Sequence, residues 1–433
     1  MVIKKDNSIN SMIKSGVGVS QHFDVEKAAE EALQKALTQV GELPSFLIVF
    51  STINYQKNQG FSRMLSRIVD YTKNKYPIIG GTTSGFMTNE GVFSSGIAIL
   101  AATIPDATIT PIFAPNTKGN PENVARQVSS KLKETYNNNL KNKFLIEFIS
   151  GPTIPRFPIL NRLNFVKSEN VGAILTKIGM PLTSVLGYGV AKDDIILAGI
   201  REKCPDYFII GGSNIDDGKL FSNYQFFGKS CTTNSMVALG IQTNEPVYTH
   251  GALHMEKTKT TFNVTETSEN GTVIDKIDGK PAFNVFMEKL SLNAEAFRDQ
   301  HLLYRTTLFY PISTSENIES STAIGAIYGS HILIGHKLKS NRIELLTASG
   351  HRILEMSDPL KQILSKGAGF LYVSACETSC EAVGAKIYRQ KELIDHLRGG
   401  MPYLITYFGG EHYSRPNEIV NVRTHSFNVI AAG

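Results

Sequence analysis

One pattern occurs three times in this chain: a short hydrophobic segment that begins with tyrosine and ends in a pair of glycines. The three copies occupy residues 76–81, 207–212 and 403–410. A hydrophobic run precedes each copy and a run of small and apolar residues follows it, as at residues 46–51 and 96–102 around the first. Such a repeat constrains the architecture strongly, because each copy is expected to form the same supersecondary unit.

Helical periodicity fills two of the gaps inside these units. Phe61, Leu65 and Ile68 share one face of a predicted helix in the first unit. Residues 392–397 form a similar segment before Pro402 in the third unit. Each unit is therefore predicted to run strand, helix, strand, Gly-Gly turn, strand. The fold class that follows is α/β, with repeated units forming helix-covered sheets in two associated domains.

The glycine pairs are the first candidates for a ligand site. Glycine tolerates positive φ and lets a ligand approach the backbone, and ligands of open α/β sheets bind outside the carboxyl ends of strands. A tight turn at each pair is the structural alternative. With their polar neighbours and one cysteine at a strand end, the predicted ligand-binding residues are Gly80, Gly81, Thr82, Thr83, Ser84, Gly211, Gly212, Ser213, Cys376, Gly409, Gly410 and Glu411.

A different pattern begins after the loop-like break at residues 243–246. Residues 261–267 alternate as a strand does, an Asn-Gly pair at 270–271 gives a hairpin signal, and residues 272–278 form the partner strand. Residues 281–290 then form an amphipathic helix with proline at its start. The predicted divisions are a flexible segment at 1–24, one domain at 25–245 and a second domain at 246–433.

The order and spacing of several short motifs carry a resemblance to a known family. Those that resemble the FIST C-terminal domain lie at residues 264–271, 277–286, 374–376, 392, 400–402, 407–411 and 425. Those that resemble the FIST N-terminal domain lie at residues 78–85 and 211–213. The chain is thus similar to the FIST sensory proteins over about residues 25–433.

The resemblance implies a cytoplasmic sensor that binds a small molecule and signals through a partner protein. Some free-standing FIST proteins bind haem, sense nitric oxide and control a histidine kinase, so the resemblance implies this finer function as well. Two departures concern the ligand. Residues 377–380 lack the arginine that members often carry after the position of Cys376, and Ser426 replaces an asparagine that usually follows the position of His425. If those side chains touch the ligand, this chain takes a different one.

Composition excludes several other classes of protein. The formal net charge is only +5 over 433 residues, without a Lys/Arg block, so we expect no nucleic-acid partner. No run of about 18 apolar residues occurs, so we expect no membrane insertion. The basic, polar N-terminus lacks the apolar segment of a signal peptide, which predicts a cytoplasmic location with four reduced cysteines. An oligomer remains compatible with this composition.

The motifs favour a protein that is not an enzyme. No Walker-type loop and no His-Glu-x-x-His motif is present. The alternative is a cysteine-dependent enzyme, in which Cys376 follows a strand and acts as a nucleophile with His412 or His425 as its base. A small buried thiol is the more common role for such a cysteine.

Three hypotheses about the ligand remain open. Haem b is one, with His250 or His254 near the domain junction as the axial ligand. A polar ligand such as an amino acid is the second, bound by the amides of the glycine loops with Glu411 facing its ammonium group. The third is a scaffold whose pocket is vestigial. His331 and His336, around a predicted strand, are interpreted as ordinary surface or hydrogen-bonded histidines.

Overall fold

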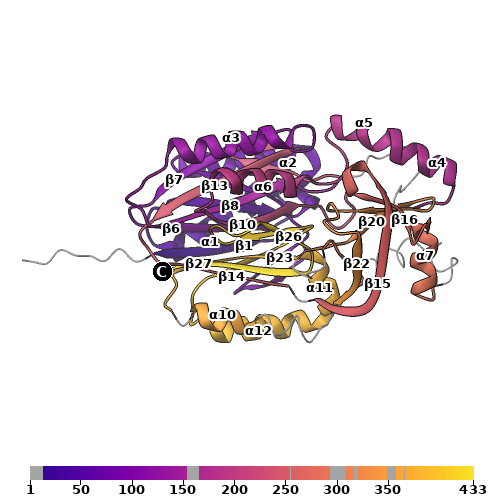
Figure 1. Ribbon diagram of the computed structural model, residues 1–433. Helices are drawn as coiled ribbons and strands as arrows, with labels where there is room; N and C mark the ends of the chain where they lie inside the picture. Colours follow the sequence, from indigo (N-terminus) through magenta and orange to yellow (C-terminus); the bar gives the residue numbers. More distant parts are fainter. Residues whose placement is uncertain are drawn as a thin grey trace, which may run out of the picture.

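A computed structural model of the 433-residue chain describes residues 13–153, 165–253, 255–292, 309–315, 320–348, 357–364 and 366–433. Its strands form three six-stranded sheets and one nine-stranded sheet. Figure 1 shows the three six-stranded sheets packed into one body, with the nine-stranded sheet at one end of it. We call these parts the three-sheet body and the satellite sheet.

The three-sheet body is built from three units of similar element order. The first contains β1 (Lys14–Ser20), α1 (Val25–Val40), β2 (Phe46–Ser51), α2 (Gly60–Thr72), β3 (Ile78–Thr82), β4 (Phe86–Thr88), β5 (Gly91–Phe93) and β6 (Ile97–Thr103). The second contains β7 (Thr108–Pro115), α3 (Pro121–Glu134), β8 (Asn142–Ser150), α6 (Asp193–Lys203), β10 (Phe208–Asn214), β11 (Gln225–Phe227), β12 (Ser230–Thr232) and β13 (Ser235–Thr243). The third contains β14 (Val247–Leu253), α10 (Ser357–Leu364), β23 (Phe370–Cys376), α11 (Glu377–Val383), α12 (Ile387–Leu397), β24 (Leu404–Phe408), β25 (Glu411–Ser414), β26 (Asn421–Arg423) and β27 (Ser426–Ala432).

The three six-stranded sheets share one strand order. It is β1-β6-β2-β3 in the first, β7-β13-β8-β10 in the second and β14-β27-β23-β24 in the third. In each sheet the last two of these strands are parallel, because a helix connects them, and the other neighbours are antiparallel. The predicted α/β class, with several sheets covered by helices, is therefore confirmed.

The hairpin of each unit pairs with the sheet of another unit. The β4–β5 hairpin of the first unit pairs with β24 of the third, the β11–β12 hairpin of the second pairs with β3 of the first, and the β25–β26 hairpin of the third pairs with β10 of the second. The exchange is cyclic, so every sheet is completed by another part of the chain. Backbone hydrogen bonds therefore cross the boundary predicted at residue 245, and the division into 25–245 and 246–433 stays a prediction.

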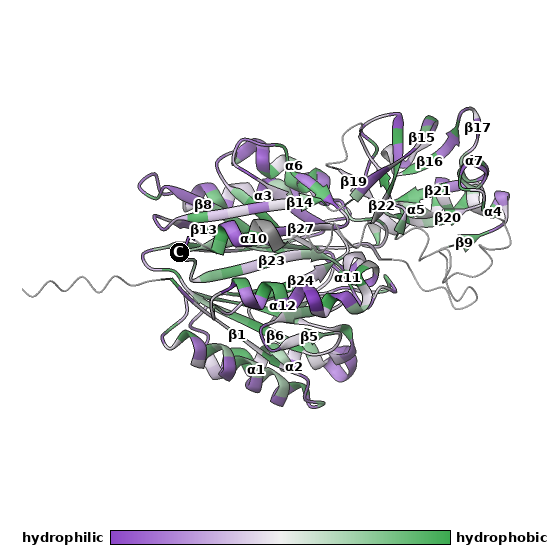
Figure 2. Ribbon diagram, turned by 90° about the horizontal axis from the view of Figure 1, so that it is seen from below, coloured by the Kyte–Doolittle hydropathy of each residue, from purple (hydrophilic) through white to green (hydrophobic). Residues whose placement is uncertain are grey.

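The centre of the body is an aromatic cluster to which all three units contribute. The Phe50 ring lies 4.8 Å from that of Phe148 and 5.6 Å from that of Phe408, and it stacks with Tyr372 at 6.4 Å. Such offset and edge-to-face contacts stabilise a core beyond the area they bury. Helices cover the outer faces in the pairs α1 with α2, α3 with α6, and α10 with α12, and Figure 2 shows hydrophobic strands inside these helices.

The satellite sheet contains most of the second sequence pattern. Its strands are β9 (Phe165–Val166), β15 (Met255–Ser268), β16 (Val273–Ile277), β17 (Lys280–Pro281), β18 (Ile312–Ser313), β19 (Ser321–Thr322), β20 (Ile324–Tyr328), β21 (His331–Ile334) and β22 (Arg342–Ala348). The predicted hairpin is β15 with β16, and the predicted helix is α7 (Ala282–Lys289). A further segment, α4 (Glu169–Ile174), a π-helical turn (Leu175–Gly179) and α5 (Met180–Val185), lies over β20 at the molecular surface (Figure 1).

The prediction of a flexible segment at residues 1–24 is wrong for its second half. β1 pairs with β6 along its whole length and is buried at six of its seven positions. Glycines allow β1 to lie close to α1, because a Cβ on Gly16 or Gly18 would overlap the backbone of that helix. Residues 1–12 lie outside the described residues. Within the described part of the chain, no helix is both long and apolar enough to cross a membrane.

Candidate functional site: a cavity beside a buried charge network

The structure brings the three glycine pairs together in the interior of the body. Ser213 N donates to Gly410 O at 2.8 Å, Gly409 N donates to Ser213 O at 3.1 Å, and Asn214 Nδ2 donates to Thr82 O at 3.0 Å. A Cβ on Gly212 would come within 2.6 Å of the Phe408 ring. The glycines therefore let neighbouring units approach one another closely.

These contacts use polar groups that the sequence assigned to a ligand. Thr83 Oγ1 donates to Tyr407 O at 2.6 Å, and Thr82 Oγ1 accepts from Tyr224 N at 3.0 Å. Of the predicted ligand-binding residues, Ser213 and Gly409 line a cavity. The remaining ten are not among the described residues that line it, and their role in ligand binding stays a prediction: Gly80, Gly81, Thr82, Thr83, Ser84, Gly211, Gly212, Cys376, Gly410 and Glu411.

This cavity, of about 190 Å³, lies between the three-sheet body and the satellite sheet. The satellite sheet lines it with Ile324, Tyr328, Leu333 and His336, and the α4–α5 segment lines it with Leu175 and Met180. The body contributes Asp193, Ser213, Glu377 and Thr378. The walls are thus mostly apolar, with polar groups gathered on the side of the body.

A buried chain of charged side chains stands behind the polar wall. His412 Nδ1 lies 2.7 Å from Glu147 Oε1, and His412 Nε2 lies 3.0 Å from Asp193 Oδ2. All three side chains are almost completely buried. Three elements place them: Glu147 on β8, Asp193 at the start of α6, and His412 on the hairpin strand β25, opposite Gly211. Gly211 is required here, because a Cβ would overlap the Glu147 carboxylate and backbone.

The charges of this network follow from burial and mutual attraction. Burial lowers the pKa of His412, but the adjacent carboxylates of Glu147 and Asp193 outweigh burial and raise that pKa to about 10. Burial raises the pKa of Asp193, but His336 and His412 outweigh it and hold the pKa well below its ordinary value. Burial also raises the pKa of Glu147, against the attraction of His412. The network therefore contains an imidazolium and an ionised Asp193 at neutral pH.

Ser213, His412 and Glu147 stand in the order of a hydrolase triad, but their charges do not suit that chemistry. Ser213 Oγ lies 3.5 Å from His412 Nε2 and donates instead to Asp193 Oδ2 at 2.7 Å. A general base must take the hydroxyl proton, and a protonated imidazole with a pKa of about 10 has no lone pair for it. The hydrogen bonds of this buried network instead hold Asp193 and Ser213 in fixed positions at the polar side of the cavity.

His336 supplies a polar atom without a partner. Its Nε2 lies 3.5 Å from Asp193 Oδ1, and its Nδ1 is buried with no hydrogen-bond partner among the described residues. Because Nε2 faces Asp193, Nδ1 is the ring nitrogen that is available to a ligand or to water. A buried polar atom without a hydrogen-bond partner costs free energy, so a partner for this atom is expected in the cavity.

Glu377 is the second polar group of the cavity whose charge state is unusual. Burial and the neighbouring carboxylates of Asp216 and Glu381 raise its pKa to about 8. It is the first residue of α11, directly after Cys376. The glutamate therefore holds its proton at neutral pH and would lose that proton to solvent when a cation binds beside it.

The Cys376 alternative lacks the geometry of a nucleophile. Its Sγ lies 2.7 Å from Thr378 Oγ1, which in turn lies 3.0 Å from the ring nitrogens of His425. Burial raises the pKa of the thiol well above its ordinary value, as the nearby carboxyl of Glu411 does further. A thiol without thiolate character is a poor nucleophile.

Two further predicted residues concern ligand and haem binding. Glu411 Oε2 accepts from Ser426 N at 3.1 Å and from Ser426 Oγ at 3.0 Å, so it is directed into its own unit. His250 lies half-buried on β14, outside the set of described residues that line the cavity. His254 lies outside the described residues. Among the residues that the structure describes, no group of three His, Cys, Asp or Glu side chains is arranged to hold a metal ion.

Sequence reasoning missed Glu147, Asp193 and Glu377 as site residues, and it assigned His412 and His336 to other roles. One signal was available, because Glu147 is the single charged residue inside the hydrophobic strand 144–150. A charge in such a strand is buried and needs a partner. Nothing in the sequence indicated that its partner is His412, which lies 265 residues away.

Comparisons with known proteins agree with the FIST N-terminal part of the resemblance noted from the motifs, and the C-terminal part stays a prediction. No curated protein matches the chain. A distant structural match is the crystal structure of cyanuric acid hydrolase from A. caulinodans, with 9% sequence identity, a TM-score of 0.36 and coverage of 97% of this chain and 99% of that one. A likeness at that TM-score carries no argument about fold or activity. The model of the FIST N domain matches residues 45–280, more than half of the chain. The chain therefore belongs to the FIST N domain family.

Proposed function

We propose that this protein is a small-ligand sensor whose ligand has a compact apolar body and one basic head group. The observation that carries the proposal is the cavity itself, whose apolar walls end at an unpartnered His336 Nδ1 and at the carboxyl group of Glu377. Membership of the FIST N domain family supports the role of a ligand-binding sensor in signalling.

The cavity limits the size of the ligand. Apolar cavities of about 150 Å³ bind benzene, so a cavity of this kind suits a molecule slightly larger than benzene. Its volume of about 190 Å³ is below the range of roughly 300–1,000 Å³ typical of sites for drug-sized ligands. A metabolite with a short branched or cyclic apolar part fits these walls.

The polar wall selects the head group. An ammonium group donates hydrogen bonds, which suits His336 Nδ1 in the tautomer that has its hydrogen on Nε2, and its positive charge favours the ionised form of Glu377. A carboxylate would face the ionised Asp193 and would keep Glu377 in its neutral form, and no Lys or Arg is among the described residues that line the cavity. An amine without a carboxylate is therefore favoured over a free amino acid.

Haem b with nitric oxide sensing and a histidine kinase partner stays a prediction from the resemblance. A tetrapyrrole is much larger than the cavity, and the candidate ligand His250 lies outside it, so the described residues do not fit this cofactor. Haem titration provides a direct check, because stoichiometric binding with a sharp Soret band would favour haem over the amine.

Isothermal titration calorimetry with benzylamine tests the proposal. We expect benzylamine to bind, sodium benzoate not to bind, and binding at pH 7 to release close to one proton, because the ammonium group ionises Glu377, whose pKa is about 8. The proton count comes from buffers of different ionisation enthalpy. Glu377→Gln is expected to abolish proton release and weaken binding about tenfold or more, a loss of about 1.4 kcal/mol.

Glu202→Gln is the matched control, since this exposed residue lies on α6, which also provides Asp193, but not at the cavity. It is expected to leave both the affinity and the proton release unchanged. Equal binding of benzylamine and benzoate, or no binding of either, would refute the basic head group.

A further inference from the structure

The α4–α5 segment has two apolar faces, although a surface helix normally has one. On the inner face, Leu175 and Met180 line the cavity. On the outer face, five large apolar side chains are exposed at intervals of three or four residues, with relative exposures of 43–67%: Val171, Ile174, Ile178, Leu182 and Leu186. We call these five residues the outer stripe.

The outer stripe differs from the apolar faces of the other helices. In α2, for example, Phe61, Leu65 and Ile68 have the same kind of spacing but are buried against the first sheet. The outer stripe spans the 16 residues from Val171 to Leu186, or roughly 22 Å at a rise of 1.5 Å per residue. Continuous exposed apolar surface on a soluble protein marks an interaction site, and this periodicity is that of a helix docking on a helix.

We propose that the outer stripe binds one amphipathic helix of a signalling partner, a helix whose apolar face is flanked by carboxylates. This proposal rests on the sensor function, because it makes the segment the link between ligand and partner. The segment lines the ligand cavity on one side and would contact the partner on the other.

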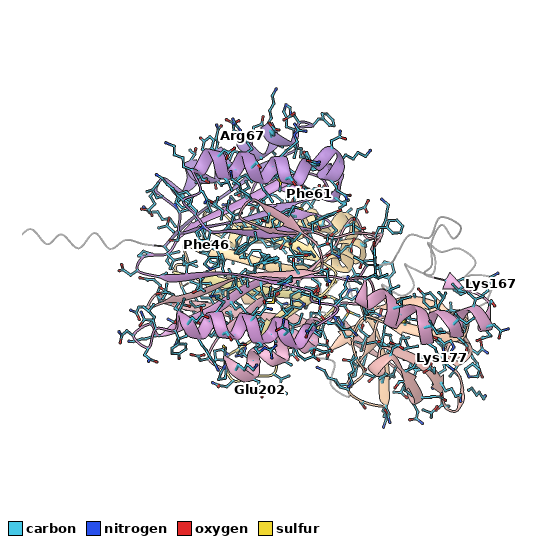
Figure 3. The ribbon with its side chains drawn as sticks, turned by 90° about the horizontal axis from the view of Figure 1, so that it is seen from above. Phe46, Phe61, Arg67, Lys167, Lys177 and Glu202 are labelled. Atoms are coloured by element: carbon cyan, nitrogen blue, oxygen red, sulfur yellow. The ribbon has the colours of Figure 1, made fainter. Side chains whose placement is uncertain are left out.

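The charge around the stripe defines the chemistry of the partner. Lys177 is exposed on this segment, and Lys167 is exposed just before its first residue (Figure 3). Glu169 is exposed as well, and its Oε2 accepts from Ser330 N at 3.1 Å and from Ser330 Oγ at 3.0 Å, which holds this carboxylate against the satellite sheet. Two lysines and one glutamate are thus the charged residues at positions 167–186, and their net positive charge favours a partner with glutamate or aspartate at its flanks.

A second copy of this chain would fit the outer stripe less well than the proposed partner helix. Two-fold pairing of the stripe would place Lys177, next to the central Ile178, against Lys177 of the other copy, and like charges that face each other repel. A strip of roughly 22 Å by 10 Å covers about 220 Å², far below the roughly 800 Å² per partner of a stable interface. An interface of that size suits a transient signalling contact.

The segment also contains a means of coupling its two faces. A π-helical turn at Leu175–Gly179 separates α4 from α5, and Leu175 and Gly179 both line the cavity. Such turns interrupt the regular hydrogen-bond ladder and are frequent at functional sites. A ligand that contacts this turn changes the affinity for the partner helix, and by linkage the partner changes the affinity for the ligand by the same factor.

Fluorescence anisotropy with a labelled synthetic helix tests the docking surface on the full chain. The probe is a peptide of about 18 residues, long enough to span the stripe, with leucines at helical spacing and glutamates at both flanks. A second peptide has lysines in place of the glutamates. We expect micromolar binding of the glutamate peptide and at least tenfold weaker binding of the lysine peptide. Ile178→Glu and Leu182→Glu are each expected to weaken the glutamate peptide at least tenfold.

Ile419→Glu is the matched control, because Ile419 is 78% exposed and lies in the third unit, away from the stripe. It is expected to leave peptide binding unchanged. Calorimetry with benzylamine on Ile178→Glu separates the two proposals, since the variant should keep its ligand affinity. If benzylamine fails on the unaltered chain while the peptides still discriminate, the ligand proposal fails and the docking surface stands. Equal binding of both peptides, no effect of Ile178→Glu, or self-association of the protein that Ile178→Glu abolishes would overturn the docking proposal.

Discussion

Replacement of His412 by glutamine tests whether the buried network holds the charges assigned to it. The imidazolium lies between Glu147 at 2.7 Å and Asp193 at 3.0 Å, and all three side chains are almost completely buried. His412→Gln removes the cation and leaves two carboxylates without it. Loss of one partner from a buried ion pair typically costs about 3–5 kcal/mol. We expect the free energy of unfolding to fall by about that amount at pH 6.5.

The pH dependence provides the sharper part of the test. The pKa of His412 is raised from 6.5 to about 10 in the folded chain. Its stabilising contribution is therefore fully present below pH 6.5 and is lost as the pH rises towards 10. The stability difference between the unaltered chain and His412→Gln should shrink over this range by an amount on the order of a few kcal/mol. Titrating groups remote from His412 cancel in the difference, whereas Glu147 and Asp193, whose pKa values depend on His412, contribute to it.

Urea denaturation at pH 6.5, 8 and 10, followed by far-UV circular dichroism, measures both quantities; the chain has no tryptophan to report by fluorescence. His331→Gln is the control, because His331 forms a 2.6 Å contact with Asp275 in a more exposed setting. A smaller loss than for His412→Gln is expected there, because the side chains of this pair are 17% and 11% exposed and solvent partly screens their attraction. The reasoning is refuted if His412→Gln costs no more than His331→Gln, or if its pH profile parallels that of the unaltered chain.

Two further changes test the packing of the glycine pairs and the state of the thiols. Gly211→Ala places a Cβ against the Glu147 backbone and carboxylate, so the free energy of unfolding measured in urea should fall by about 1–3 kcal/mol or more. Gly325→Ala is the control, because its Cβ would enter open space and should change this free energy little. Burial raises the pKa of the Cys376 and Cys380 thiols well above the ordinary value. Iodoacetamide should therefore label both cysteines only after unfolding. Rapid labelling of Cys376 in the native chain would instead support the alternative of a cysteine-dependent enzyme.

The repeated unit was accessible from sequence because it depends on local patterns. The hydrophobic strands, the glycine pairs and the amphipathic face of α2 follow from periodicity within about 60 residues. The hairpin exchange was not accessible in this way. The local sequence of the hairpin after each glycine pair is the same whether the hairpin pairs with its own sheet or with the sheet of another unit. Only long-range strand pairing determines which sheet it joins.

The candidate site was predictable only in part for the same reason. Ser213 and Gly409 line the cavity because the carboxyl ends of β10 and β24 face the satellite sheet. The other glycine pairs are packed against neighbouring units, since a glycine that admits a ligand and a glycine that admits a second strand have the same sequence signature. His336 and Glu377 come from separate parts of the chain, and no spacing rule connects them.

Comparison of the first two sheets shows why the charges at the cavity are not needed for the fold. In the first sheet Gly80 lies between Val49 and Phe226, and in the second sheet Gly211 lies between Glu147 and His412 at the equivalent position. The same strand order thus accommodates an apolar pair or an ionic one. Well-packed apolar residues are often as stabilising as a buried ion pair, or more so. The ionic pair therefore has its best explanation in what it supports: it fixes Asp193 and, through Asp193, the polar wall of the cavity. That wall depends on a hairpin strand that the third unit supplies to the second, so the proposed ligand site is completed only when these two units have assembled.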